Sequence, residues 1–352
     1  MIAILMGCNP AVQKTDVDKP LSYHRMSYAQ LFGIATFDGY EQLFYLNGND
    51  TIWSLKSTEL PQSGMKVAVL SSVFAGFIEE LGLQNSIIAV DNDKYFNDSQ
   101  LVRRIKNGEI SSVGEEGQLQ IEKLLGLKPD LLITSSFGFN NQSLKTRLKH
   151  LNIHMLMCDN FKEQHPLARA EWIKFFGFLY HQSQMADSIF VAIENNYKSI
   201  RNSTPSRQIK PKVMTDAMYS EVWNVPGGNS YSARLIEDAG AEYIFMDKKE
   251  LYTYPLNLES VLKATAQADY WIHVNQFRTQ EEMLKVNSRY ALFRPFMLNH
   301  VYNNNKRENA FGGNDFWEKG AVRADLVLRD LVYIFSADKI SSDKLYFYTL
   351  VD

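Results

Sequence analysis

A glycine-rich turn is the first candidate for a ligand contact in this chain. Residues 225–230, VPGGNS, precede a segment whose apolar residues have helical spacing. Backbone N–H groups at the start of a helix can receive an anion or the polar edge of a ligand. A plain turn explains the same residues equally well, so both interpretations stay open.

The seven histidines do not indicate a metal site. His150 and His154 are four residues apart, a spacing that puts two side chains on one face of a helix. The segment LKHLNIHMLM passes from a helix end into a strand, however, so this spacing does not pair the two imidazoles. We expect histidines on the surface or in loops, and no metal ligands.

Signatures of nucleotide binding and of nucleophilic catalysis are absent from the sequence. The chain has no G-x-G-x-x-G after a strand, no G-x-x-x-x-G-K-[ST] and no G-x-S-x-G. Nothing in the sequence pairs two carboxylates for acid–base catalysis. We therefore expect no catalytic residues and no cofactor.

Cys8 is the candidate site of lipid attachment. It ends the apolar run ILMGC, where the small Gly7 suits cleavage before a cysteine that then carries lipid, and a tether-like polar stretch follows up to residue 20. Only residues 2–6 precede the Gly-Cys pair after the initial Met, without a basic residue, whereas a secretory leader has a basic start and about 7–15 apolar residues. Either the true start codon lies upstream, or the motif is chance and Cys8 is a small buried thiol.

Composition excludes several classes of protein. A chain of 352 residues predicts two domains or one large α/β unit. The net charge of −3 shows no basic footprint for nucleic acid, and no run approaches the roughly 18 apolar residues of a membrane span. The aromatic content of 12% suits either an apolar ligand pocket or an aromatic core.

Alternating strand and helix patterns predict an α/β fold with parallel sheets flanked by helices. Residues 183–203 have apolar side chains at four-residue steps without Pro or Gly, which predicts a stiff helix of about 30 Å. A hairpin is expected with its turn at residues 47–50, and one helix over residues 166–180. We divide the chain into a leader and tether, an N-terminal lobe, a linking helix and a C-terminal lobe, at 1–20, 21–182, 183–203 and 204–352.

Several phrases resemble ABC-transporter substrate-binding proteins for iron–siderophore complexes, haem and cobalamin. They are KVAVLSS, LQIEKLLGLKPDLLITSS, PLARAEWIKFFG, WNVPGGNSYSARLIEDAGAEY and GGNDFWEKGAVRADLVLRDLVYIF, within about residues 67–335. The resemblance implies a class III binding protein with two Rossmann-like, chelatase-like lobes joined by a rigid helix. It also implies a monomeric, lipid-anchored periplasmic receptor at the inner membrane, with an ABC permease, its ATPase and a small-molecule metal chelate as partners.

Two other classes fit such a fold. A chelatase-like enzyme would need a metal-facing set of His, Glu or Cys, or a cofactor loop, and neither is visible. A surface adhesion or scaffold protein would not need matched loops at a cleft. A receptor without turnover is therefore the expectation.

The resemblance also implies which residues meet the ligand, since open α/β sheets bind ligands at the carboxyl ends of their strands. The expected ligand contacts are Tyr95, Ser136, Phe137, Arg169, Trp223, Tyr231, Tyr252, Tyr254, Arg294, Tyr302, Asp315, Phe316, Trp317 and Lys319. Glu122 and Glu259, each early in a helix, are expected to dock onto the permease.

The kind of chelate stays open between three classes. NDFWEKG resembles the Asp-Trp-Phe-Glu-Arg phrase of cobalamin binders, but its aromatics are swapped and Lys319 stands in place of arginine. A siderophore usually needs an arginine cluster, for which only Arg169 and Arg294 are candidates. Haem needs an axial His or Tyr, which the tyrosines can supply. We favour a corrinoid or a ferric siderophore, with haem as the alternative.

Overall fold

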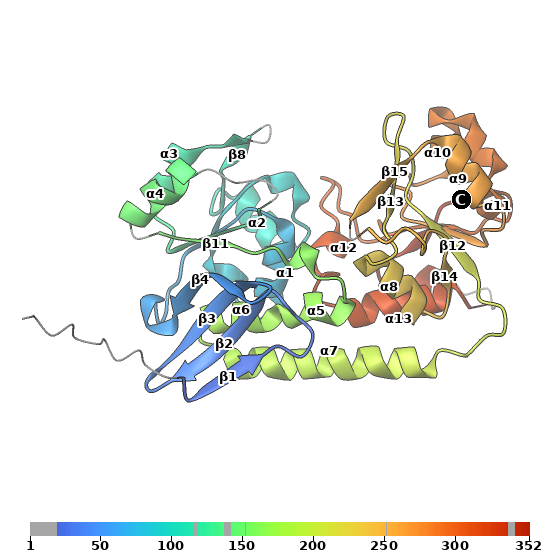
Figure 1. Cartoon of the computed structure of the whole chain (residues 1–352). Helices are drawn as coiled ribbons and strands as arrows, with labels where there is room; N and C mark the ends of the chain where they lie inside the picture. The colour runs from blue at the N-terminus through green and yellow to red at the C-terminus, as the bar shows by residue number, and fades with distance from the viewer. Residues whose placement is uncertain (1–19, 116–117, 137–141, 152, 251, 337–341) are drawn as a thin grey trace, which may run out of the picture.

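The computed structural model describes residues 20–115, 118–136, 142–151, 153–250, 252–336 and 342–352. Cys8, the expected tether and Phe137 lie outside the described residues. The described chain forms two α/β lobes side by side, with the long helix α7 (Ser183–Ser203) running beneath both (Figure 1). This helix covers the same residues as the linking helix expected from the sequence.

The N-terminal lobe begins with a four-stranded antiparallel sheet. The sequence predicts one hairpin here, and that hairpin is β3–β4, but two further strands extend it. Gly39 and Gly48 both have positive φ in the tight turns between successive strands, a conformation that favours glycine. The strands are β1 (Ser22–Arg25), β2 (Phe32–Phe37), β3 (Tyr40–Asn47) and β4 (Asp50–Lys56).

A five-stranded parallel sheet forms the centre of the same lobe, in the order β11-β10-β5-β6-β7. Its three central strands are almost entirely buried because helices cover both faces. The strands are β5 (Val67–Val69), β6 (Ile87–Val90), β7 (Ser111–Ser112), β10 (Leu131–Thr134) and β11 (His154–Met157). The helices between them are α1 (Ser72–Glu80), α2 (Ser99–Lys106), α3 (Ile121–Leu127) and α4 (Gln142–His150).

The C-terminal lobe repeats this plan around a sheet of order β14-β12-β16-β17-β18. The last strand, β18, pairs with β17 in antiparallel orientation, and the other three strand pairs of this sheet are parallel. The strands are β12 (Lys212–Thr215), β14 (Glu242–Tyr243), β16 (Tyr270–Ile272), β17 (Val301–Asn303) and β18 (Thr349–Leu350). Around them lie the ribbon β13 (Trp223–Pro226) with β15 (Thr253–Leu256), and the helices α8 (Tyr231–Asp238), α9 (Leu258–Ala264), α10 (Gln280–Val286), α11 (Arg294–Met297), α12 (Asp315–Glu318) and α13 (Ala324–Ile334).

Helices α5 (Pro166–Glu171) and α6 (Ile173–Leu179) replace the single helix expected over residues 166–180. The break falls at Trp172, whose fully buried indole packs edge-on against Phe32 of the first sheet. The tertiary contact therefore overrides helical spacing that is continuous in the sequence.

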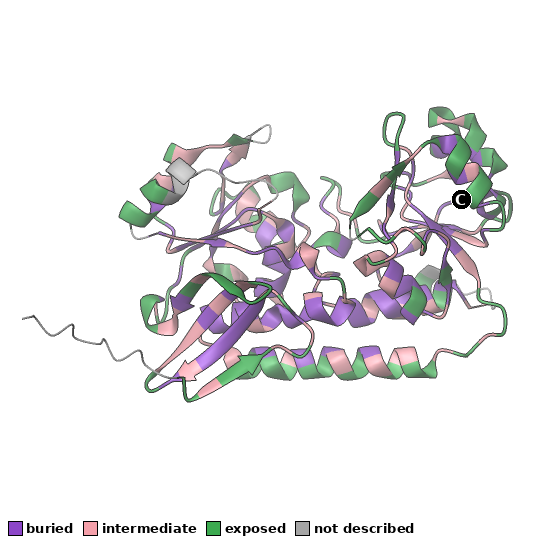
Figure 2. Ribbon diagram, in the orientation of Figure 1, coloured by how far each residue is buried: buried purple, intermediate pink, exposed green. Residues whose placement is uncertain are grey.

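Helix α7 ties the two lobes together through one apolar face. Ala186, Phe190, Ile193 and Tyr197 are buried. Along α7, buried and intermediate residues lie on the side of the helix that faces the lobes, and exposed residues lie on the opposite side (Figure 2). The helix packs against α6 in one lobe and α13 in the other. One hydrophobic cluster consequently includes buried residues of both lobes.

A second joint between the lobes is made by α12. The carboxylate of Glu318 accepts the backbone N–H groups of Asn97 and Asp98 at 2.6 and 2.9 Å. Lys319 lies 2.9 Å from Glu79 of α1. Burial raises the pKa of Glu318 to about 8, against the opposing effect of the two N–H donors and with a contribution from nearby Glu79 and Asp315.

Replacing Gly76 with alanine should weaken the packing of α1 on α12. A Cβ atom here would overlap the backbone carbonyl of Glu318, which cannot move without shifting α12. We expect Gly76→Ala to lose about 1–3 kcal/mol of unfolding free energy in urea, the usual range for overpacking. Gly126→Ala is the matched control, because nothing lies within 4 Å of its Cβ position on α3. Equal losses in both variants would contradict this packing.

Glu318 should make stability fall as pH rises. The pKa of Glu318 in the folded state, about 8, exceeds the ordinary value of 4.5. The protonated carboxyl therefore contributes its full stabilisation below pH 4.5, and this contribution is lost as the pH rises through 8. Each pH unit in this window costs up to about 1.4 kcal/mol. We expect the Tm of the wild type to fall more steeply between pH 5 and 9 than that of Glu318→Gln, which cannot ionise.

Glu109→Gln serves as the control for this pH profile, because the Glu109 side chain is 52% exposed. Its profile should follow the wild type. If the profile of Glu318→Gln also runs parallel to the wild type, the buried carboxyl does not hold a proton at neutral pH.

Candidate ligand-binding site

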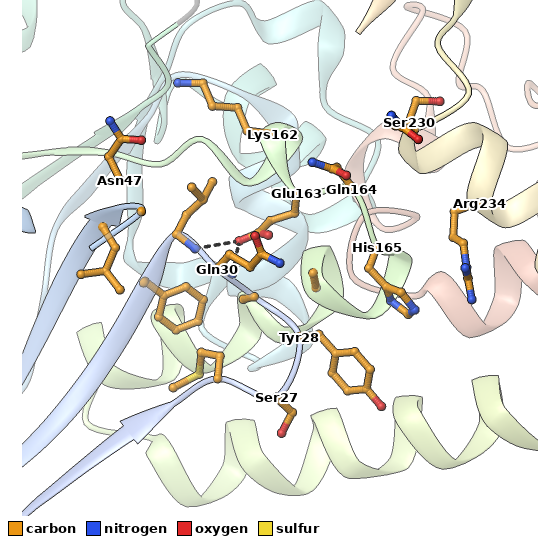
Figure 3. Close-up of a pocket in the computed structure, with 18 of the residues that line it drawn as sticks. Ser27, Tyr28, Gln30, Asn47, Lys162, Glu163, Gln164, His165, Ser230 and Arg234 are labelled. Carbon is orange, nitrogen blue, oxygen red and sulfur yellow. Dashed lines mark hydrogen bonds between the residues drawn. The ribbon is translucent and has the colours of Figure 1, made fainter. Parts of the chain in front are cut away.

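A cavity of about 980 Å³ lies between the lobes and is lined by both (Figure 3). The N-terminal lobe contributes the connection from β1 to β2, the turn after β3 and the segment leading into α5. The C-terminal lobe contributes the glycine turn before α8, two α8 side chains, Met246 and Tyr252. The lining residues are 25–32, 46–49, 162–165, 168, 228–230, 234, 237, 246 and 252.

Two buried carboxylates shape the N-terminal wall. Glu171 accepts the backbone N–H groups of residues 27–29 at 2.9, 2.7 and 2.9 Å. Glu163 accepts those of Gln30 and Leu31 at 2.9 and 3.1 Å, as the dashed lines in Figure 3 show. Burial raises the pKa of Glu163 while these N–H donors oppose the rise. Five consecutive backbone donors are thus satisfied, and the connection is fixed beside α5.

His165 lies at the floor of the cavity beside Tyr28 (Figure 3). It is the N-cap of α5, and its Nδ1 accepts the backbone N–H of Leu167 at 3.1 Å. The imidazole stacks on the Tyr28 ring with centroids 5.2 Å apart. Burial lowers the pKa of His165, so the neutral ring is favoured, with its proton on Nε2.

The glycine turn reaches the cavity, but its N–H groups already have acceptors. The N–H groups of Gly227, Gly228 and Ser230 donate to the carbonyls of Tyr252, Lys248 and Gly227. A Cβ on either glycine would overlap the backbone of residues 246–250, so the glycines serve close packing. Most of the N–H groups that the sequence analysis considered for binding an anion are therefore already bonded to backbone carbonyl groups.

Among the predicted ligand residues that the structure describes, Tyr252 alone lines the cavity, and it is 54% exposed. Just behind the wall, the Arg169 guanidinium of one lobe lies 4.0 Å above the Tyr231 ring of the other. Arg169 also donates to the carbonyls of Phe161 and Glu163 at 2.7 and 3.1 Å. Burial lowers the pKa of Arg169. This stack joins the lobes next to the cavity.

Trp223 and Arg294, two of the expected ligand contacts, lie outside the cavity lining. The Trp223 indole is fully buried, stacks on Trp271 at 5.5 Å and donates to the Thr215 carbonyl. Arg294 pairs with Asp269, which precedes β16, so it lies at the amino end of that strand. Ligand loops follow the carboxyl ends instead.

The remaining predicted residues of the C-terminal lobe also lie outside the cavity lining. Tyr254 lies in β15, where the Lys248 ammonium is 5.2 Å from its ring centroid. Tyr302 lies in β17, and burial raises the pKa of its hydroxyl.

The predicted residues in and directly after α12 lie outside the cavity lining, in the region where α12 packs against the N-terminal lobe. Asp315 pairs with Arg307, and Lys319 pairs with Glu79. Phe316 is nearly buried against the rings of His273, Phe347 and Tyr348. Trp317 remains 57% exposed.

Two predicted residues of the N-terminal lobe lie at the carboxyl ends of strands but away from the cavity lining. Tyr95 follows β6 and is 59% exposed. Ser136 follows β10, and its backbone N–H donates to Asp159 at 2.7 Å.

Glu122 and Glu259 occupy corresponding positions on the two lobes. Each lies in the first turn of an exposed helix, α3 or α9, on the side of its lobe away from α7 (Figure 1). Each pairs with an arginine at 2.7 Å, Glu122 with Arg147 and Glu259 with Arg289. The arginine lowers the pKa of Glu259.

The cavity wall formed by residues 25–32, together with Glu163 and His165, is absent from the sequence prediction. Two signals point to it. His165 directly precedes Pro166, which marks a helix start and makes His165 the cap. Glu171 lies at the end of α5 among buried apolar residues, and a buried carboxylate needs hydrogen-bond donors.

The described residues offer neither a cluster of metal ligands nor a membrane-spanning helix. No group of three or more His, Cys, Asp or Glu side chains among them is arranged to hold a metal ion. No helix in them is long and apolar enough to cross a bilayer.

Two lipoproteins from one archaeon are similar to this chain in sequence. An uncharacterised lipoprotein of Methanocaldococcus jannaschii is 24% identical over 294 residues, covering 80% of this chain and 68% of the relative. A second uncharacterised lipoprotein of that organism is 25% identical over 208 residues, covering 55% and 51%. Both alignments leave a substantial part of the relative unmatched.

Solved structures show the same fold at low identity. A periplasmic haem-binding protein from Pseudomonas aeruginosa superposes with a TM-score of 0.61 at 16% identity, covering 83% of this chain and 99% of that one. The siderophore-binding protein FhuD from Vibrio cholerae, bound to ferric Desferal, gives 0.57 at 17% identity, covering 78% and 100%.

The family model described as periplasmic binding protein matches residues 67–304, which span the parallel sheets of both lobes apart from the final strand β18. The fold is that of class III periplasmic binding proteins, with two largely parallel sheets flanked by helices. The chain belongs to the periplasmic binding protein family, the non-enzymatic solute receptors of ABC transport.

Proposed function

We propose that this chain captures a metal chelate, a ferric siderophore or a corrinoid, in the cavity between its lobes and delivers it to an ABC permease. The observation that carries the proposal is the cavity of about 980 Å³ with walls from both lobes. Ligand pockets of drug-sized molecules have about 300–1,000 Å³. A haem receptor of the same fold is the alternative.

The charge of the wall supports a weakly charged ligand. Lys162 pairs with Asp159 at 2.7 Å, and Arg234 lies 3.2 Å from Asp238 and 3.4 Å from Glu237. These two cations therefore offer little net charge to a ligand, which leaves Arg25 as the third cation of the lining. Hydrogen-bonding amides are more abundant in the lining: Gln30, Asn47, Asn49, Gln164 and Asn229.

A lipid anchor at Cys8 is part of the same proposal. The relatives from Methanocaldococcus jannaschii are named lipoproteins, and a tethered receptor stays close to its permease. Mass spectrometry of the protein from the membrane fraction tests the modification.

Binding should require an open cavity. We expect the purified protein to bind ferric desferrioxamine, cyanocobalamin or haemin with Kd below about 10 μM, near −7 kcal/mol, in calorimetric titrations. Gln164→Trp places a large ring at an exposed position of the lining and should weaken that binding at least about tenfold. Gln267→Trp, at an exposed position outside the lining, is the control. Absence of binding to all three probes would overturn the proposed ligand class.

Reversal of the two docking charges should abolish uptake without changing affinity for the chelate. Glu122→Lys with Glu259→Lys would repel the arginines that the family resemblance expects on the permease. Uptake of labelled chelate by cells is the measurement. Glu109→Lys with Glu281→Lys, exposed acids of the two lobes, is the matched control. A loss of chelate affinity in the docking variant would place these residues in the ligand site instead.

A further inference from the structure

We propose a second ligand site, for a small aromatic carboxylate, in a groove between α2 of the N-terminal lobe and residues 309–311 of the C-terminal lobe. The groove has a volume of about 380 Å³, within the range of about 300–1,000 Å³ that is typical of ligand pockets. It shares no lining residue with the larger cavity between the lobes. The site is therefore independent of the metal chelate proposed for that cavity.

The charge of the groove favours an anion. Its lining contains Arg103 and Lys106, which lie one turn apart on α2, and no Asp or Glu. Arg104 of the same helix is paired with Glu109 at 3.3 Å. Arg103 and Lys106, in contrast, have no carboxylate partner among the residues that the structure describes. Both cations are thus available to the carboxylate of a ligand, which forms strong charge-assisted hydrogen bonds with such groups.

An exposed aromatic ring forms the apolar side of the groove. The Phe311 side chain is 53% exposed, and the Lys106 ammonium lies 4.2 Å from its ring centroid. A ligand whose carboxylate binds Lys106 therefore brings its own ring within reach of Phe311, where two aromatic rings attract each other. Val102 and the aliphatic parts of the two cationic side chains extend this apolar surface. The juxtaposition of charge and ring defines the class of ligand.

The loop that carries Phe311 is fixed by Asn309. The Asn309 side-chain oxygen accepts the N–H groups of Phe311 and Gly313, each at 3.0 Å. The backbone N–H of Asn309 donates to the Gly313 carbonyl at 2.8 Å. Phe311 is therefore presented to the groove without rearrangement of the loop.

Hydrogen bonds between the lobes hold the two walls of the groove together. Asn309 Nδ2 donates to the Phe96 carbonyl at 2.9 Å, and Asn97 Nδ2 donates to the carbonyls of Arg307 and Gly313 at 2.7 and 2.8 Å. Both asparagines line the groove. Preorganised walls reduce the cost of ordering on binding. A ligand in the groove contacts both lobes and should strengthen the joint that α12 makes between them.

The test is a titration of the whole protein with cinnamate, an aromatic carboxylate, followed by saturation-transfer NMR of the probe. Cinnamamide has the same ring and a neutral amide, so it serves as the matched probe. We expect cinnamate to bind with a Kd below about 1 mM. Cinnamamide should bind at least about tenfold more weakly, because it cannot form a charge-assisted hydrogen bond to the two cations through a carboxylate.

Variants of the lining separate the effect of charge from the effect of the ring. Arg103→Gln with Lys106→Gln should weaken cinnamate at least about tenfold and leave cinnamamide within about threefold. Phe311→Ala should weaken both probes at least about threefold. Lys123→Gln with Lys263→Gln, at exposed positions outside both linings, is the matched control and should bind like the wild type. Thermal unfolding should be the same in all variants, because the substituted side chains are exposed.

Three results would overturn the inference. They are absence of saturable cinnamate binding, equal cinnamate affinity in Arg103→Gln with Lys106→Gln and in the wild type, and displacement of cinnamate by a chelate that binds the larger cavity. Absence of binding of ferric desferrioxamine, cyanocobalamin and haemin, with cinnamate binding intact, would instead remove the proposed receptor function and support the second site alone.

Discussion

The cavity depends on two buried glutamates that bind a run of backbone N–H groups. Without Glu163 and Glu171, the donors of residues 27–31 would be partly buried without acceptors, which proteins rarely tolerate. The carboxylates in turn would lack the donors that make their burial possible. This mutual dependence fixes the first sheet against α5, and the fixed sheet supplies one wall of the cavity and positions Tyr28 against His165.

The residues that pack the lobes differ in type from the residues that line the cavity. Aromatic rings with helical or strand spacing, such as Trp172 and Trp223, are buried in the lobes and stiffen them. The cavity surface instead combines amides, backbone segments and a few balanced charges. Arg169 over Tyr231 and Glu318 against Asn97 and Asp98 then hold the lobes in one relative position. A receptor built this way is largely preorganised for its ligand.

The sequence predicts the framework much better than the site. Strand β10 and helix α7 coincide with their predicted residues because short apolar runs and uninterrupted helical spacing are local signals. The cavity wall depends on bonds between residues 132 to 144 positions apart, which no local pattern reveals. Burial of the Trp223 side chain could not be predicted for a related reason, since sequence spacing does not distinguish a buried indole from an exposed one.

The hydrophobic cluster that runs through α7 into both lobes couples the folding of the two lobes. The larger hydrophobic cluster does not end at the linking helix, because Phe190 and Tyr197 belong to one continuous cluster with α6 and α13. A smaller cluster, which includes Leu124 and Leu132, belongs to the N-terminal lobe alone. Local and global unfolding then become hard to separate, and the chain should lose both lobes in one cooperative step. Recombination that exchanges a single lobe between relatives would need matched faces on α7, so the two lobes are expected to be inherited as a unit.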